Sequence, residues 1–164
     1  MSEGAERLRT LRTRLLSLAA MHSDRLVNDE LARVDARKWH YAVLATLDEF
    51  GAASQAQLSD RTRIYRSDLV AVLNELAERE QVERAPDPAD KRRNLVRITT
   101  AGRRTLRKLD KLLAAVEDEV LAPLDPTQRA DLTSLLTTLV DHHSNPKSHD
   151  SGQQEPQRQR PGST

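Results

Sequence analysis

The stretch "DPADKRRNLVRITTAGRR", residues 87–104, carries five arginines and one lysine against two aspartates. It opens with an Asp-Pro pair, which favours a turn, and runs into a segment where Val96 and Ile98 alternate with polar neighbours. The preceding run "QVERAP" alternates in the same way at Val82 and Arg84. Together the two runs predict a small β-hairpin with a long basic tip.

Charge is segregated along the chain, although the formal net charge is only +1. Residues 61–108 hold 13 Lys/Arg against 7 Asp/Glu, whereas residues 109–143 hold 2 against 7. A lopsided solvated surface and a basic face for a polyanion both fit this distribution. With 164 residues, 37% of them hydrophobic and only four aromatic (Phe, Trp and Tyr), the chain predicts one domain with a thin core, which favours an oligomer.

Several chemistries are excluded by what the sequence lacks. The absence of cysteine excludes disulfides, thiolate nucleophiles, cysteine metal sites and thiol-based redox sensing. Without a long apolar run or a compact apolar signal region, we expect a cytoplasmic protein with no membrane partner. No glycine-rich phosphate loop, nucleophile elbow or paired-histidine helix is present, so we expect neither an enzyme nor a cofactor. The candidate metal ligands show no recognised spacing, and no metal site is expected: His22, Glu30, His40, His142 and His143.

Helices are predicted before the hairpin. Leucines three and four residues apart predict an amphipathic helix over residues 6–20, and a more apolar helix is expected over residues 38–50. Ser54 and Gln57 have the spacing of a capping box, which predicts the start of a short helix over residues 55–62. The next helix has a buried stripe at Leu69, Val72, Leu73 and Leu76, and its opposite face carries Ser67, Ala71, Asn74 and Glu78.

Two more helices are predicted after the hairpin. Thr99 caps a long helix whose leucines and valines repeat three and four residues apart until Pro123 ends it. Asp125 followed by proline then begins a final leucine-striped helix. Residues 144–164 contain no apolar side chain, so we expect a disordered polar tail there.

Two short helices followed by a basic hairpin have the layout of a winged helix-turn-helix. The hairpin "DPADKRRNLVRITTAGR" resembles the wing signature of the MarR family of bacterial transcription regulators, in which Asp, any residue and Arg precede an alternating strand and a Thr-x-x-Gly helix start. Those positions are Asp90, Lys91, Arg92, the strand over residues 96–99, and Gly102. The preceding segment, residues 54–88, is also similar to the family's recognition segment, and the resemblance extends over roughly residues 8–143.

The resemblance implies a mainly α fold with a small β-hairpin wing, in which a winged helix-turn-helix lobe joins a helical dimerisation region. It implies one MarR-type domain over residues 1–143, with dimerisation helices at about 5–22 and 100–143 and a DNA-binding lobe at about 38–99. It also implies a homodimer. The leucine stripes agree, because they exceed what one thin core needs, although packing within one subunit is the alternative.

The wing would make two kinds of DNA contact if it acts as in the family. Arg92 would enter the minor groove, where A·T-rich narrowing deepens the negative potential. Lys91 and Arg93 would contact phosphates, and Asp90 would brace the wing by a salt bridge.

The second helix of the motif has the right size for the major groove, and its outer residues suit base edges or phosphates. Asn74 can pair with adenine, Ala71 can touch a thymine methyl, and Ser67 or Arg66 can hold phosphate. The full predicted DNA-binding set is Ser54, Gln55, Arg66, Ser67, Asp68, Ala71, Asn74, Lys91, Arg92 and Arg93.

Members of the family often release DNA when a small anionic aromatic compound, a metal or an oxidant binds between the dimer helices and the DNA lobe. Trp39, His40 and Tyr41 offer a flat surface and polar tips to an anionic or aromatic effector, although ordinary core packing is the alternative. The sequence thus predicts a sequence-specific double-stranded DNA-binding regulator, a ligand-responsive repressor that binds a pseudo-palindrome as a homodimer. The alternatives are a ligand-independent architectural winged-helix protein and a helical dimer that binds a small molecule and has a degenerate DNA lobe.

Three positions depart from the family pattern. Arg63 and Glu80 stand where relatives usually carry glycine, and Tyr65 stands where the recognition helix usually starts with a small polar residue. Replacing glycine where φ is positive costs on the order of 1 kcal/mol. We therefore expect either turns that are built differently or a less stable lobe.

Overall fold

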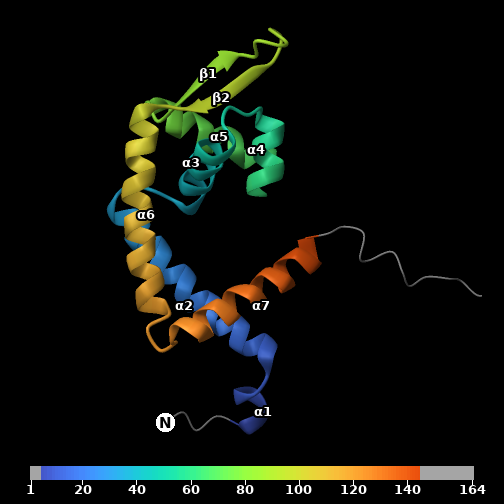
Figure 1. Cartoon of the computed structure of the whole chain (residues 1–164), viewed down its shortest axis with the longest axis vertical. Helices are drawn as coiled ribbons and strands as arrows, with labels where there is room; N and C mark the ends of the chain where they lie inside the picture. Colours follow the sequence, from blue (N-terminus) through green and yellow to red (C-terminus); the bar gives the residue numbers. More distant parts are fainter. Residues whose placement is uncertain (1–4, 145–164) are drawn as a thin grey trace, which may run out of the picture. The chain divides into compact units, whose positions relative to one another are not determined.

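The computed structural model describes residues 5–144, which are mainly helical with one β-hairpin, as the sequence predicts (Figure 1). The elements are α1 (Glu6–Arg9), α2 (Arg12–Arg33), α3 (Lys38–Phe50), α4 (Gln55–Thr62), α5 (Arg66–Glu78), β1 (Val82–Pro86), β2 (Asn94–Ile98), α6 (Thr100–Val120) and α7 (Pro126–Ser144). The chain divides after Val120 into two compact units, of which the second contains α7. Each unit is described by itself.

The lobe of the first unit is built on a core shared by α3, α4, α5, the hairpin and the start of α6. The stripe predicted on α5 lies at its centre, because Leu69, Val72, Leu73 and Leu76 are all at most 1% exposed. The remaining buried members are Val43, Leu44, Leu47, Ala53, Leu58, Ile64, Val82, Val96, Ile98 and Leu106. Burial of this apolar surface fixes the orientation of α4 and α5, and so decides which of their side chains face solvent.

The hairpin is antiparallel, with Val82 opposite Ile98 at one end and Pro86 opposite Asn94 at the other. Val96 also exchanges backbone hydrogen bonds with Ala53, at 2.8 and 3.0 Å, which ties β2 to the segment before α4. Because side chains alternate between the faces of a strand, Val82 and residue 84 share the core-facing side of β1. The hairpin is therefore anchored to the lobe along its base.

The predicted helix starts are confirmed. The Ser54 backbone N–H donates to Oε1 of Gln57 at 2.9 Å, and the Gln57 N–H donates to the Ser54 hydroxyl at 3.2 Å. Thr99 caps α6 by accepting the Gly102 N–H at 3.0 Å. Gly51 follows α3 with φ of 77°, a conformation that glycine adopts without strain.

The turns that depart from the family pattern keep a left-handed backbone without glycine. Arg63 follows α4 with φ of 58°, and Glu80 follows α5 with φ of 56°. Residues with a Cβ are strained there by roughly 1–2 kcal/mol. The turns are therefore built in the left-handed conformation, with the strain placed in the turn between α4 and α5 at Arg63 and just after α5 at Glu80.

The first long helix differs from its prediction in extent. A short α1 is followed by a break at Thr10, and α2 then continues to Arg33 instead of ending near residue 20. The second core cluster accounts for the extension, because Leu31 is 1% exposed and packs with Ala36 and Leu109 of α6. Tertiary packing therefore sustains a segment whose own sequence is largely polar.

Apolar side chains on α2 and α7 stay exposed. Among the residues described for α7 none is buried, and its start is capped by Asp125, which accepts the Gln128 N–H at 2.9 Å. Together with Leu8 of α1 and Leu11 just before α2, the exposed apolar side chains of these helices are Leu15, Leu16, Met21, Leu135, Leu136, Leu139 and Val140. The predicted tail beyond Ser144 lies outside the described residues, and within them no helix is both long and apolar enough to cross a bilayer.

Candidate nucleic-acid interface

The outer face of α5 carries the residues that the sequence assigns to base and phosphate contacts. Burial of the leucine stripe leaves Arg66, Ser67, Ala71 and Asn74 exposed, whereas Asp68 is half-buried in the first turn. Tyr65, which precedes α5, is 81% exposed and makes no capping bond with its side chain. The helix thus offers solvent a face of short polar side chains with an aromatic ring at its start.

The wing loop between β1 and β2 is held by Asp90. Its carboxylate accepts the Arg92 backbone N–H at 3.0 Å and lies 3.7 Å from Nε of Arg93. The Arg93 N–H also donates to the Asp90 carbonyl at 2.9 Å. These local bonds close the tip and leave the side chains of Lys91, Arg92 and Arg93 exposed to solvent.

A pocket of about 320 Å³ lies between the start of α4 and the hairpin. Two predicted residues of α4's first turn, Ser54 and Gln55, line it together with Arg93 of the wing. The other lining residues are Ala56, Arg84, Asn94 and Val96. Two guanidinium groups and the positive end of a helix dipole meet here, a combination that favours an anion such as a backbone phosphate.

Arg84 is a further residue of this surface that the sequence reasoning did not assign to DNA. Its Nη2 donates to Oδ1 of Asn74 at 2.9 Å, so it joins the hairpin to the outer face of α5. The signal available in the sequence was the two-residue period that places it on the same side of β1 as Val82. Its partner on α5 follows only from the tertiary structure.

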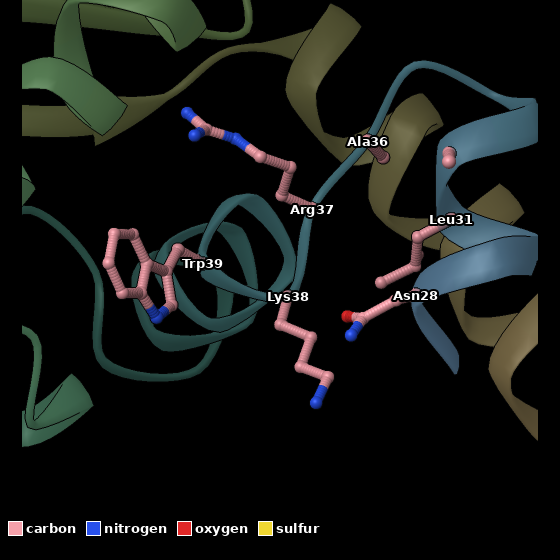
Figure 2. A pocket seen from close by; sticks show the side chains of 7 residues that line it. Asn28, Leu31, Ala36, Arg37, Lys38 and Trp39 are labelled. Atoms are coloured by element: carbon pink, nitrogen blue, oxygen red, sulfur yellow. The ribbon is translucent and has the colours of Figure 1, made fainter. Parts of the chain in front are cut away.

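A second pocket, of about 400 Å³, lies between the end of α2 and the start of α3 (Figure 2). Of the three residues predicted for an effector, Trp39 alone lines it, with its side chain at the start of α3. The other lining residues are Asn28, Leu31, Ala32, Ala36, Arg37 and Lys38. Its two cations each have a carboxylate partner, because Lys38 pairs with Asp24 and Arg37 with Glu75. In Figure 2 the Trp39 ring extends away from Leu31 and Asn28. An anionic ligand with an apolar body would have to compete with these two carboxylates.

His40 lies inside the lobe instead of in this pocket. Its Nδ1 accepts the Arg37 backbone N–H at 3.2 Å, and its Nε2 lies 2.8 Å from Oε2 of Glu75 on α5. Since Nδ1 is an acceptor, the ring proton sits on Nε2 and the imidazole is neutral. Burial lowers the pKa of His40 below its ordinary value, against the opposing effect of the Glu75 hydrogen bond.

Glu75 receives a second partner, because the guanidinium of Arg37 forms an ion pair with the same carboxylate oxygen. The hydrogen bonds from His40 and from Arg37 hold the pKa of Glu75 below its ordinary value. Arg37 therefore belongs both to the wall of the Trp39 pocket and to an ion pair with the helix that carries Asn74.

Tyr41, the third predicted effector residue, points toward α6. Its hydroxyl donates to Oδ1 of Asp110 at 3.0 Å, and burial, together with that contact, raises the pKa of the phenol. Trp39, His40 and Tyr41 thus face three different surroundings. Within residues 5–144, no three His, Asp or Glu side chains gather in a way that would hold a metal ion.

Comparison with known proteins gives a match to a family model over part of the chain and sequence similarity to transcription regulators over longer stretches. Residues 30–93 match the model of the MarR family. The HTH-type transcriptional repressor NicR of Pseudomonas putida is 26% identical over 105 residues, which span 64% of this chain and 66% of NicR. The multiple antibiotic resistance protein MarR of Escherichia coli is 27% identical over 128 residues, or 77% of this chain and 89% of that protein.

Among solved structures, the PcaV transcriptional regulator of Streptomyces coelicolor, in complex with its natural ligand, is similar to this fold. The two align with a TM-score of 0.72 at 27% identity, covering 85% of this chain and 99% of PcaV. The likeness therefore extends beyond the lobe that the family model matches.

Proposed function

We propose that the chain is a regulator of the MarR type, a ligand-responsive repressor that binds a pseudo-palindromic DNA duplex as a homodimer. The match of residues 30–93 to the model of that family and the similarity to NicR and MarR support the proposal. The observation that carries the proposal is the single surface formed by the outer face of α5, the start of α4 and the arginine-bearing wing. The Arg84–Asn74 hydrogen bond and the pocket shared by Ser54 and Arg93 join its parts. The repressor role follows NicR, which is a transcriptional repressor by name.

The proposed DNA contacts come from α5 and from the wing, as expected from the sequence. Ser67, Ala71 and Asn74 would face base edges in the major groove, with Arg66 at the phosphates. Arg92 would enter the minor groove, and the pocket between α4 and the hairpin would take a backbone phosphate. The lobe would then be a regulator's DNA-reading module, acting in the cytoplasm, and we assign it no catalytic role.

The exposed apolar side chains of α1, α2 and α7 support the homodimer. Leucines and a valine between 36% and 64% exposed along two separate units would be covered by a second copy of the chain. We assign dimerisation to the helices at about residues 5–22 and 100–143, within one MarR-type domain over residues 1–143, and the DNA-binding lobe to about residues 38–99.

The Trp39 pocket is proposed as the effector site. An anionic group would bind Arg37 and Lys38 by displacing Glu75 and Asp24, their carboxylate partners, and Leu31 would contact an apolar body. PcaV, a regulator of the same fold, was solved with its natural ligand, which supports ligand control in this chain.

Selection from a randomised duplex library at about 150 mM salt tests the proposal, since that salt suppresses weak non-specific binding. The expected result is recovery of one pseudo-palindromic sequence, bound by a species of twice the chain mass. Arg92→Ala should weaken binding to the selected duplex, and Arg25→Ala, which removes an exposed cation of α2 outside the proposed dimerisation region and the lobe, is the matched control. Enrichment of no sequence would contradict the proposal and favour a helical dimer with a degenerate lobe. Binding without sequence preference would favour an architectural protein.

A further inference from the structure

The placement of Arg84 differs from that of the other wing cations. It stands opposite the buried Val96 in the hairpin and shares the core-facing side of β1 with Val82. Its side chain therefore lies along the lobe, where it lines the pocket at the start of α4. The guanidinium ends on the outer face of α5, 2.9 Å from Oδ1 of Asn74.

The chemistry of this contact fixes the orientation of the Asn74 carboxamide. A guanidinium has hydrogen-bond donors and no acceptor, so the atom of Asn74 that faces it must be the oxygen. The amide nitrogen, with its two N–H donors, is then directed away from Arg84. Asn74 is exposed, so these donors are available to a partner in solvent.

Donors and acceptors on a base edge decide what such an amide can read. A free asparagine pairs with adenine through its oxygen and its nitrogen together, because adenine offers N6 as a donor and N7 as an acceptor. With one of the two lone pairs of the oxygen used by Arg84, the pair presents N–H groups from both side chains beside that oxygen. Guanine, whose N7 and O6 are both acceptors in the major groove, matches that pattern.

We propose that Arg84 is a specificity-determining residue, which holds Asn74 so that α5 reads guanine instead of adenine at one position in each half-site. The proposal rests on the proposed DNA-binding function. It changes the adenine pairing expected for Asn74 from its residue type alone. Arg84 acts by positioning Asn74 and by adding N–H donors of its own beside the amide.

The test measures which base is preferred at each position. If Arg84 only supported the fold, its loss would weaken binding without changing the preferred base. Duplexes selected by the wild-type chain are varied at each position to the other three bases, and dissociation constants are measured by fluorescence anisotropy at about 150 mM salt. The wild type should prefer guanine over adenine at one symmetric position by roughly 5- to 150-fold, the range of a good two-bond base contact. Arg84→Ala should abolish that preference or reverse it toward adenine, because the released amide can rotate.

Three variants make the comparison sharp. Arg84→Lys keeps a donor for the Asn74 oxygen and should keep part of the guanine preference. Asn74→Ala should remove discrimination at the same position whether residue 84 is arginine or alanine. Arg93→Ala removes a cation from the same pocket, and it should weaken all duplexes equally without changing which base is preferred.

Two results would overturn the proposal. One is an Arg84→Ala variant whose base preferences match those of the wild type at every position. The other is a wild-type preference for adenine at the position that Asn74→Ala relaxes. Failure of the wild type to select any duplex is a different outcome, because it removes the DNA-binding function itself.

Discussion

Replacing Gly102 with alanine should destabilise the fold, although alanine is the better helix former. Gly102 lies in the first turn of α6, where a Cβ would stand 2.1 Å from the Gln81 carbonyl oxygen and 2.8 Å from Cγ1 of Ile98. Ordinary contact distances for a Cβ begin near 3.4 Å. Relief therefore requires a shift of about 1 Å between backbone segments that are both packed into the lobe.

The expected loss of stability is the sum of two costs and one gain. Forcing an extra methyl group into a packed site costs roughly 1–3 kcal/mol. The Gln81 oxygen accepts the Thr99 N–H at 3.1 Å, and disturbing that bond costs about 1 kcal/mol more. Alanine regains at most about 1 kcal/mol of helix propensity. The net loss is about 1–3 kcal/mol, or a Tm lower by roughly 2–12 °C for a chain of this length.

Thermal unfolding followed by circular dichroism measures the change. Gly51→Ala is the matched control, because a Cβ there meets nothing within 4 Å and only the backbone φ of +77° opposes it. With ψ of −162° this backbone region is essentially confined to glycine, so that variant should lose roughly 1–3 kcal/mol through backbone strain alone, without a clash. A Gly102→Ala protein as stable as the wild type would refute the argument that α6 is seated against the turn before β1.

Four more outcomes are expected. Arg92→Ala should weaken binding to all duplexes and lower the slope of log K against log salt by about one unit, measured by salt titration. Because burial lowers the pKa of His40, the folded protein binds a proton at this residue less readily than the unfolded chain does. The free energy of unfolding should therefore be unaffected by His40 above its ordinary pKa of 6.5 and should fall as the pH drops below that value. His40→Gln should flatten that fall in urea titrations between about pH 7 and pH 5. Ser54→Ala should cost about 1 kcal/mol of unfolding free energy through the lost cap, and a loss near zero would contradict it. Leu139→Asp should convert a dimer into an 18.5 kDa monomer in sedimentation at micromolar concentration, whereas an unchanged dimer would exclude α7 from the interface.

Features that depend on residues close together in the sequence could be predicted from the sequence alone. The Ser54–Gln57 box and the Thr99 cap involve partners three residues apart, and each is found as predicted. The hairpin follows equally from alternation within two short runs. Short-range hydrogen bonding and side-chain periodicity decide these features, so no knowledge of the tertiary fold was needed.

Contacts between distant residues could not be predicted in the same way. Arg37 meets Glu75 across 38 positions of sequence, and Tyr41 meets Asp110 across 69. The adjacent residues 39–41 looked like one polar aromatic patch, yet successive positions on a helix turn by about 100° and face different neighbours. At the end of α2, Leu31 is buried against Leu109 of α6, a contact between residues far apart in the sequence.

The position of Arg37 would couple anion binding in the Trp39 pocket to DNA binding by α5. Arg37 lines the Trp39 pocket and also pairs with Glu75 of α5. An anion that drew the guanidinium away from Glu75 would therefore alter the helix that we propose reads DNA. Coupling of this kind is reciprocal: if the anion weakened operator binding tenfold, operator DNA would weaken anion binding tenfold, a coupling free energy of about 1.4 kcal/mol. The protein that is not on DNA would then bind the anion more tightly than the protein on its operator. The anion concentration needed to release the protein from a promoter would rise with the number of operator copies in the cell.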